Sequence, residues 1–336
     1  THSAVENADR RIACGQTRII CHGASLPTSD LPGMMSGMSR SLVLIGAPTS
    51  AGSYAPGQEA APRVLRELGL IEALRAAGRD VHDAGDGPLQ VWRPDRENPR
   101  AMNLPEVVEA VQAVGRAVAT AIQADADVLV IGGNCTISLG VMSAFTGEPA
   151  AGLLYLDRHF DLNTPHSTTD GALDWMGMAH ALNLAGAAAE LASAFDRTPL
   201  LTPAHVWFAG IDPSAATDFE REQAAQLELR WCSSEDLIRA PAVVVADALE
   251  YLPAGPLAVH VDVDVLDFTD APLSENTDGR NTGPSLAVLT QVLDLACHDP
   301  RFRALSIGEI NPARAAAEPD ALLRIIATLA TALQVT

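Results

Sequence analysis

Two short segments of the chain place acidic residues and a histidine at alternating positions. Asp157, His159 and Asp161 follow one apolar run, and Asp262 and Asp264 interrupt another. An extended backbone would direct the members of each set to the same side. Because an isolated carboxylate is costly to bury, either arginine side chains or metal ions must neutralise these groups.

Metal ions explain the pattern better than arginine does. Arg158 alternates with the acidic positions, so in an extended segment it points away from them. Oxygen-rich ligation with one or two histidines suits Mn²⁺ or a similar divalent ion. Carboxylates that bridge two such ions hold them ~3.5–4 Å apart, and a water between the ions loses a proton near neutral pH. The resulting hydroxide is a nucleophile for hydrolysis.

A third polar segment runs from an apolar stretch through Gly132 and Gly133 into Asn134 and Cys135. Taken alone, it indicates a strand-to-helix turn with a buried cysteine. A phosphate-binding loop is excluded, because the glycine spacing is wrong and the chain contains no lysine.

The elements that position these residues alternate along the chain. Short β-type runs are interleaved with Ala- and Leu-rich stretches of helical period, which is typical of βα units around a parallel sheet. We expect strands at 42–47, 80–84, 128–131, 152–156, 205–209, 229–232, 258–263 and 304–310. We expect helices at 62–77, 105–122, 137–145, 174–195, 215–226, 241–252, 285–297 and 320–333. A closed barrel and an open doubly wound sheet both fit, and both place functional loops at the carboxyl ends of strands.

The first part of the chain differs from the rest. Residues 1–40 are polar and rich in Gly and Ser, without sustained periodicity, so we predict a poorly ordered N-terminal extension. No linker is visible after residue 40, so residues 41–336 are predicted to form a single catalytic domain.

Composition excludes several classes of protein. All 22 basic residues among the 336 are arginine, against 42 acidic residues, for a formal charge of -20. A kinase, a P-loop nucleotidase and a Schiff-base enzyme each need a lysine that this chain lacks. The acidic balance disfavours nucleic acid, and no apolar run approaches the ~18 residues that a membrane helix needs. Five scattered cysteines predict no disulfide framework and a cytoplasmic location.

Four motifs together carry a family resemblance. They read Gly-Gly-Asn-Cys-Thr-Ile-Ser at 132–138, Asp-Arg-His-Phe-Asp-Leu-Asn-Thr-Pro at 157–165, Val-Asp-Val-Asp-Val-Leu-Asp at 261–267 and Glu-Ile-Asn-Pro at 309–312. In this order, and at expected strand ends, they make the chain resemble the ureohydrolase (arginase/agmatinase) family from about residue 41 to the C-terminus. None of the motifs is specific on its own.

The resemblance implies an α/β fold, a three-layer α/β/α sandwich with a parallel, roughly eight-stranded sheet. It also implies a binuclear Mn²⁺ site and hydrolysis of a linear amidine or guanidino C–N bond by a metal-bound hydroxide, commonly with release of urea. The implied partner is a small cationic guanidino or amidino substrate, and the implied assembly is a homo-oligomer, a trimer or hexamer.

Residues that match the family's motifs take roles by the same resemblance. The metal ligands are Asp157, His159, Asp161, Asp262 and Asp264. Asp161 also accepts the proton from the bridging water, and Glu309 orients the guanidinium. Asn163 and Asp212 match positions that help to hold the other end of the substrate.

The first departure from the family's pattern is Cys135, which stands where the family presents a histidine ligand. A thiolate is a softer ligand and favours Zn²⁺ or iron over Mn²⁺. Three outcomes stay open: a hybrid binuclear site with Cys135 as a ligand, a single-metal enzyme, or an inactive site. A single-metal amide or amidine hydrolase on the same fold, and a catalytically degenerate protein with a binding or assembly role, are therefore the alternative functions.

A second departure follows the second motif, where the family has a Ser-Gly-x-x-His-Gly run whose histidine moves protons. Met176 falls about where that histidine belongs, and methionine cannot transfer protons. We expect His166 to act as the substitute acid in preference to His180. Asp170 stands where the family often has serine and adds a substrate-facing carboxylate that favours a more cationic substrate. The long polar segment 270–283 flanks the site and is a further candidate for shaping the substrate pocket.

Overall fold

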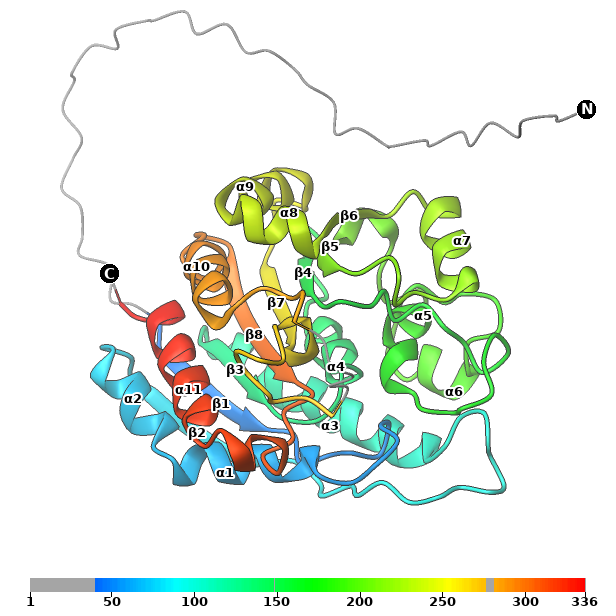
Figure 1. Ribbon diagram of the computed structural model, residues 1–336, viewed down its shortest axis with the longest axis horizontal. Coiled ribbons are helices and arrows are strands. Elements are labelled where there is room, and N and C mark those ends of the chain that lie inside the picture. Colours follow the sequence, from blue (N-terminus) through cyan, green and yellow to red (C-terminus); the bar gives the residue numbers. More distant parts are fainter. Residues whose placement is uncertain (1–39, 148, 276–280, 336) are drawn as a thin grey trace, which may run out of the picture. The chain divides into compact units, whose positions relative to one another are not determined.

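The computed structural model describes residues 40–147, 149–275 and 281–335, and these contain an eight-stranded sheet with helices on both faces (Figure 1). The strands are β1 (Leu42–Gly46), β2 (Val81–Asp86), β3 (Asp127–Ile131), β4 (Gly152–Leu156), β5 (Val206–Ile211), β6 (Arg230–Ser233), β7 (Leu257–Asp262) and β8 (Phe302–Gly308). Their order across the sheet is β2-β1-β3-β8-β7-β4-β5-β6, and every pairing among them is parallel. The sheet is open, with β2 and β6 at its edges, so the barrel alternative is wrong. The predicted N-terminal extension falls on residues 1–39, outside the described residues, and on Arg40.

The helices occupy most of the connections between strands. They are α1 (Ala61–Glu67), α2 (Leu70–Ala76), α3 (Leu104–Gln123), α4 (Ile137–Ser143), α5 (Gly177–Ala181), α6 (Ala189–Ala192), α7 (Asp218–Gln226), α8 (Ser234–Arg239), α9 (Pro241–Tyr251), α10 (Leu286–Cys297) and α11 (Asp320–Ala332). Short 3-10 turns η1 (Gln58–Ala60), η2 (Asp174–Met176), η3 (Pro203–His205), η4 (Val263–Val265) and η5 (Arg314–Ala317) lie between them. Within the described part of the chain, no helix combines the length and apolar character that crossing a bilayer demands.

Both faces of the sheet are buried, because alternate side chains of each strand belong to two separate apolar cores. Leu42 and Leu44 of β1 lie in the core beneath α1, α2 and α8 to α11, whereas Ile45 lies in the core beneath α3 to α7. In β4, Leu154 and Tyr155 divide in the same way. Parallel strands covered by helices on both sides need such continuous apolar sequences. The two cores confirm the predicted three-layer α/β/α sandwich.

Three helix predictions need correction. The expected helix 62–77 is two helices, because Gly69 between them has φ 92°, in the left-handed region. Helix α8 is absent from the prediction, although Ser233 accepts a hydrogen bond from its third residue, Asp236, as an N-cap does. The expected helix 174–195 contains only a 3-10 turn and the short helices α5 and α6.

Tertiary contacts override the helical period of residues 174–195. The N–H of Ala179 donates to the carbonyl of Asp161 at 3.0 Å, and the N–H of Leu201 donates to that of Ala181 at 2.9 Å. Asn183 has φ 53°, which ends any regular helix there. The stretch therefore folds against the loop after β4, where it forms part of the wall of the site described below.

The four motifs of the sequence meet at one edge of the sheet. Cys135 follows β3, Glu309 follows β8, Asp262 ends β7 and Asp157 follows β4. These four strands are neighbours at the centre of the sheet, and parallel strands present their carboxyl ends at the same edge. The fold therefore brings together residues that are far apart in sequence.

Candidate metal centre

The loop after β4 is not extended, so the geometric reason given for its three predicted ligands is wrong. β4 ends at Leu156, and Asp161 has φ 54°, in the left-handed region that non-glycine residues rarely adopt. The backbone N–H of His159 donates to Asp157 Oδ1 at 2.7 Å. A turn of the chain, rather than strand alternation, directs Asp157, His159 and Asp161 into the site.

A second turn places the acidic pair of β7. Asp262 is the last residue of the strand, and Asp264 lies in the 3-10 turn η4. Asp262 Oδ1 accepts the backbone N–H of Asp264 at 2.7 Å and so caps this turn. One carboxylate therefore comes from the end of the strand and the other from the turn that follows it, so the two do not share one face of a strand.

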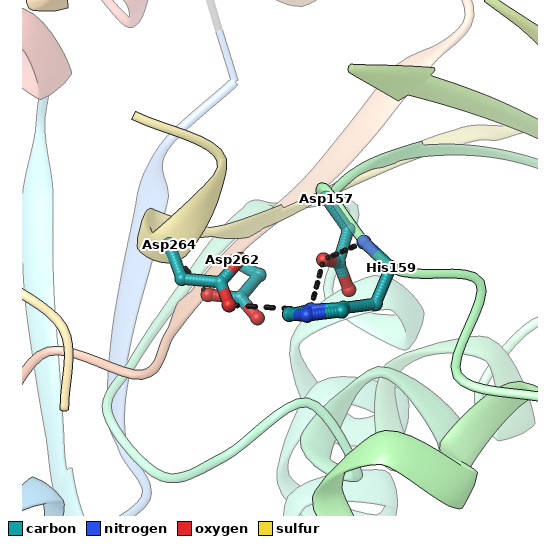
Figure 2. Close-up of side chains that lie close together, drawn as sticks. All are labelled: Asp157, His159, Asp262 and Asp264. Carbon is teal, nitrogen blue, oxygen red and sulfur yellow. Dashed lines mark hydrogen bonds and ion pairs between the residues drawn. The ribbon is translucent and has the colours of Figure 1, made fainter. Parts of the chain in front are cut away.

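One cluster combines these two turns. Ligand atoms of Asp157, His159, Asp262 and Asp264 all lie within 4.8 Å of one another. His159 Nδ1 lies 3.2 Å from Asp264 Oδ2 and 3.4 Å from Asp157 Oδ1, as Figure 2 shows. The three carboxyl groups are buried, and the histidine is only slightly exposed. Three carboxylates and one imidazole at this spacing suit a hard divalent ion.

Two further groups of ligand atoms meet at Cys135, and together they form a second cluster that overlaps the first at Asp157 and at Asp262. Ligand atoms of Cys135, Asp157 and Asp161 lie within 4.8 Å of one another, and so do those of Cys135, Asp262 and Glu309. The Cys135 thiol is buried and donates to Asp262 Oδ2 at 3.3 Å. The position that departs from the family therefore reaches the site, among oxygen ligands.

Burial and mutual repulsion hold the acids of this centre towards their neutral forms. Burial raises the pKa of Asp157 to about 6, with the Asp264 charge adding to the effect. Burial and neighbouring carboxylates also raise the pKa values of Asp161 and Asp262, and they raise that of the Cys135 thiol. The pKa of His159 is raised although burial lowers it, because the Asp264 and Asp157 charges outweigh that burial. The five acids of the two clusters thus outnumber their one imidazole.

Arg158 does not neutralise these buried acids. This decides between arginine and metal ions as the groups that stabilise them. Arg158 pairs instead with Asp212, its Nη2 lying 3.1 Å from Oδ2. Among the described residues, Asp157 Oδ2 is buried without a hydrogen-bond partner. An orphaned carboxylate oxygen between two acidic clusters is costly unless a cation binds there. The residues present fit one or two divalent metal ions.

Glu309 is held at the edge of the centre by a strained backbone. Its φ is 63°, in the left-handed region, and its N–H donates to the carbonyl of Gly133 at 2.8 Å. Its carboxylate accepts the backbone N–H of Cys135 at 3.1 Å and the side-chain amide of Gln58. Left-handed non-glycine residues cost about 1–3 kcal/mol and gather at functional sites, and Asp161 is a second one here.

A cavity of about 500 Å³ opens onto both clusters. Cys135, His159, Asp161, Asp262, Asp264 and Glu309 form its inner end. Its remaining wall includes Tyr54, Asp170, Asp174, Trp175, Glu275 and Arg314. Of these wall residues, the sequence predicts only Asp170 by name. Arg314 is the one arginine or lysine among the described lining residues, so the wall is strongly acidic.

Three predicted residues lie away from this cavity. His166 is exposed and does not line it. Asn163 is buried, and its Oδ1 accepts hydrogen bonds from Ser167 and Thr217 at 3.1 and 3.0 Å. Asp212 borders a separate hollow and is held by its ion pair with Arg158. The expectation that His166 acts on the substrate has no support from this geometry.

The rival histidine, His180, is part of the core. It is fully buried, its Nδ1 lies 2.7 Å from the carbonyl of Met176, and its Nε2 accepts the N–H of Ala188 at 3.0 Å. Burial lowers its pKa to about 4, so it stays neutral at physiological pH. Both ring nitrogens are occupied, which leaves this histidine no proton to exchange with the cavity.

A row of side chains outside the quoted motifs supports Asp161 from the strands beneath it. The Tyr155 hydroxyl donates to Asp161 Oδ2. The Tyr155 ring stacks on His260 with centroids 4.8 Å apart, and His260 Nδ1 lies 2.8 Å from Ser306 Oγ. These residues are neighbours across β4, β7 and β8, since Tyr155 pairs with His260 and His260 with Ser306. A signal was available: all three share one face of adjacent strands.

Comparison with known proteins gives a consistent picture. The family model described as "Arginase family" matches residues 40–333. Human Arginase-1 is 28% identical over 289 residues, covering 83% of this chain and 87% of that protein. The arginase of Bacillus caldovelox is 26% identical over 235 residues, covering 68% of this chain and 77% of the relative.

Solved structures share the fold. The Bacillus caldovelox arginase superposes with a TM-score of 0.78 at 21% identity, covering 88% of this chain and 99% of that one. Formimidoylglutamase from Bacillus subtilis superposes with a TM-score of 0.65 at 16% identity, covering 89% and 88%. The same architecture therefore occurs in enzymes with different names.

Proposed function

Because the chain belongs to the arginase family, we propose that it is a metal-dependent hydrolase that cleaves a C–N bond of a linear amidine or guanidino compound, with release of urea or a related product. One observation carries the proposal. The two ligand clusters overlap at Asp157 and Asp262 beside a cavity, and the five acids in them outnumber their one imidazole. Shared carboxylates are the arrangement that holds two ions close together.

The two clusters divide the ligands between two ions. Asp157, His159, Asp262 and Asp264 would hold a hard ion such as Mn²⁺. Asp157, Asp161, Asp262 and Cys135 would hold the other, and the thiolate makes that position more favourable for Zn²⁺ than a histidine would. Bound ions would lower the pKa of a water and stabilise the charge that develops on the substrate.

The residues of the chain take the remaining roles. Asp161 is placed to accept a proton from the attacking water, because its Oδ2 is oriented by Tyr155. Glu309 lines the cavity next to both clusters and would hold the guanidinium. Asp170 and Glu275 add negative charge further out, which favours a substrate with a cationic chain. Asn163 and Asp212 stay predicted contacts for the far end of the substrate, by family resemblance.

A single-metal amide or amidine hydrolase is the second candidate. The hydrogen bond from Cys135 Sγ to Asp262 favours it, because a protonated thiol occupies the place of a metal ligand without needing an ion. An inactive protein is disfavoured, since it would keep these buried, mutually repelling carboxylates without a cation to stabilise them.

Metal analysis and product release together test the proposal. The purified protein is expected to contain two equivalents of divalent metal and to release urea or an amide product from at least one member of a panel. The panel should contain guanidino acids, guanidino amines and a formimino compound, with simple amides as the comparison. One equivalent of metal would favour the single-metal candidate. Metal at trace level, or loaded protein inactive on every compound, would contradict the enzyme proposal.

Three further expectations from the sequence concern the domain, the location and the assembly of the protein. We propose that residues 41–336 form one catalytic domain and that the protein is cytoplasmic, which the absence of a disulfide among the three described cysteines supports. We also propose a homo-oligomer, a trimer or hexamer, on family resemblance. Sedimentation of the purified protein checks the assembly, and a monomer at micromolar concentration would contradict it.

A further inference from the structure

We propose that Asp174, which is not among the site residues expected from the sequence, is the catalytic acid that protonates the departing nitrogen. The inference rests on the proposed function and deepens it by assigning the proton-transfer step. Asp174 lines the same cavity as His159, Asp161 and Glu309. Its position takes over the role that the sequence led us to expect of His166, which lies outside the cavity.

The backbone fixes Asp174 at the cavity wall. The carbonyl of Gly52, in the loop after β1, accepts the N–H groups of both Leu173 and Asp174 at 2.6 and 2.9 Å. Asp174 Oδ1 accepts the N–H of Trp175 at 2.8 Å, which sets the orientation of the carboxyl group. Oδ2 makes no hydrogen bond with the described residues and is available to a ligand in the cavity.

The other carboxyl groups of the wall are already engaged. Glu275 accepts hydrogen bonds from Asn311 at 2.8 Å and from Ser53 at 3.3 Å, one on each oxygen. Glu309 is held through both oxygens as described above. Asp170 is exposed at the rim, and its Oδ1 accepts the N–H of Ala172 at 2.9 Å. Asp174 is the half-buried acid of the wall with an unengaged oxygen.

The remaining proton carriers of the cavity are less suitable. His159 belongs to the ligand cluster, and Cys135 is buried against Asp262. Burial and nearby acids raise the pKa of Tyr54 further above its ordinary value, so this phenol is too weak an acid for rapid transfer near neutral pH. Among the described lining residues, no second histidine is present.

Burial and the groups around Asp174 raise its pKa towards the range in which a catalytic acid works. Five titratable groups face it: Asp170 from its own segment, Tyr54 from the loop after β1, His159 from the loop after β4, Glu275 from the loop after β7 and Glu309 after β8. Burial, followed by the Asp170 and Glu275 charges, raises the pKa of Asp174 to about 7, while His159 acts in the opposite direction. A catalytic acid is most effective when its pKa lies near the working pH.

The proposed step balances for a guanidinium substrate R–NH–C(NH₂)₂⁺. A new C–O bond forms when water attacks the central carbon, and one water proton passes to Asp161. The bond between carbon and the substituted nitrogen then breaks, its electron pair goes to that nitrogen, and Asp174 supplies the proton. The remaining proton of the attacking water returns to Asp174, and the proton held by Asp161 passes to the amine. The products are urea and R–NH₃⁺, with the net charge unchanged.

The leaving group provides the decisive test. In metal-loaded Asp174→Asn, kcat for an alkylguanidine is expected to fall by about 10²–10³-fold with little change in KM, as for loss of a general acid. An arylguanidine, whose amine leaves without full protonation, should lose less than tenfold. Asp174→Glu should recover part of the loss and shift the alkaline limb of the kcat profile. In the wild type, activity falls as pH rises through the pKa of Asp174, because the required form is the protonated one; in Asp174→Asn this limb disappears.

Two measurements separate this role from a structural one. Metal content of Asp174→Asn should match the wild type and its melting temperature should not fall, since the variant removes charge from a crowded acidic wall. The carboxylic acid band seen by infrared spectroscopy in the metal-loaded wild type near pH 6 should be weaker in the variant, which reports the titration of Asp174 without any turnover. Asp247→Asn, an exposed acid on α9, is the matched control.

The outcomes distinguish this inference from the function on which it rests. If the wild type hydrolyses a guanidine and Asp174→Asn keeps kcat within twofold and retains its alkaline limb, the inference fails and the proposed function stands. An equal loss for alkyl and aryl substrates also overturns it. If the wild type releases product from no compound, both fail together.

Discussion

The two clusters of the proposed metal centre form two halves that lie side by side and differ in their one side chain that is not a carboxylate. In the first, His159 lies between Asp157 and Asp264, 3.4 and 3.2 Å from their oxygens. In the second, Cys135 contacts the shared ligand Asp262 at 3.3 Å. The carboxylates are common to the design of both halves, whereas the non-carboxylate ligand differs. A site built this way can retain its affinity for divalent ions while the identity of the ion in one half changes.

The difference extends to the support beneath each half. Asp161, in the half with the cysteine, has a left-handed backbone and receives the Tyr155 hydroxyl. Asp264, in the other half, is oriented by the cap that the shared Asp262 forms on a short turn. One half therefore depends on a tertiary contact between strands and loop, and the other on a local hydrogen bond. The predictions below separate the two halves by perturbing what they share and then what they do not.

The largest effect is expected from a ligand that belongs to both halves. Asp157→Asn weakens both ion sites at once, so bound metal should fall below half an equivalent and kcat/KM by about 10³-fold or more, from a loss of several kcal/mol of electrostatic stabilisation. Elemental analysis and steady-state kinetics measure this, with Asp247→Asn as control. Retention of one full equivalent of metal would show that Asp157 does not bridge.

The cysteine tests the half that departs from the family. Cys135→Ala should lose one of the two equivalents of metal and about 10²-fold in kcat/KM. Cys135→His should retain both equivalents and shift the preference of the protein from Zn²⁺ towards Mn²⁺, because imidazole is a harder ligand than thiolate. Competition dialysis against the two ions measures the shift. If metal content and preference are the same in both variants as in the wild type, Cys135 is not a ligand.

A smaller effect should be confined to the same half. Tyr155→Phe removes the hydrogen bond to Asp161 Oδ2 and leaves the ring stacked on His260. Loss of such a supporting contact typically lowers metal affinity by about 10-fold to 100-fold, and we expect the lower end for one of the two ions only. Calorimetric titration of the metal-free protein should show one shifted phase and one unshifted phase. Tyr251→Phe, whose hydroxyl donates to Pro203 instead, is the control; equal shifts in both phases would remove the distinction between the halves.

The smallest effect is on stability, and it comes from the charge that both halves share. The pKa of Asp157 is raised to about 6 and that of Asp174 to about 7, against ~3.9 in an unfolded chain, so the native apoprotein holds more protons in between. Unfolding then becomes easier as pH rises through this window, and the raised pKa of His159 acts in the same direction. The chelated protein should melt at least about 5 °C lower at pH 8 than at pH 5, and added Mn²⁺ should reverse the order. A melting temperature that rises with pH in the chelated protein would contradict these shifts.

The sequence could predict which acids and which histidine meet, because their signal is local. Asp157, His159 and Asp161 stand next to an apolar run, as do Asp262 and Asp264, and the carboxyl ends of parallel strands converge. The structure does bring these side chains together, but turns, not strand alternation, orient them. Periodicity reveals where a strand ends, but the path of the following loop depends on contacts with segments far away in sequence.

Most residues of the cavity wall could not be predicted from the sequence. Tyr54, Asp174 and Glu275 come from three separate loops, and no spacing links them. His180 and Asp174 both lie in the stretch predicted as one helix, and the break in that helix places one in the core and the other at the cavity. The predicted substrate-shaping segment 270–283 contributes Glu275, although residues 276–280 lie outside the described part of the chain.

The order of the strands has a consequence for how the protein is made. β7 and β8 come last in the chain and lie at the centre of the sheet, where they join β3 on one side to β4 on the other. A ribosome therefore releases both flanks of the sheet before the strands that unite them, and each flank has an open strand edge of the kind that favours aggregation. The loop after β4 emerges before Asp262, Asp264 and Glu309, which complete the two clusters and arrive only with residues 257–309. The proposed metal ligands therefore come together only at the end of folding, and a nascent chain that stalls before β7 presents the open strand edges that chaperones protect.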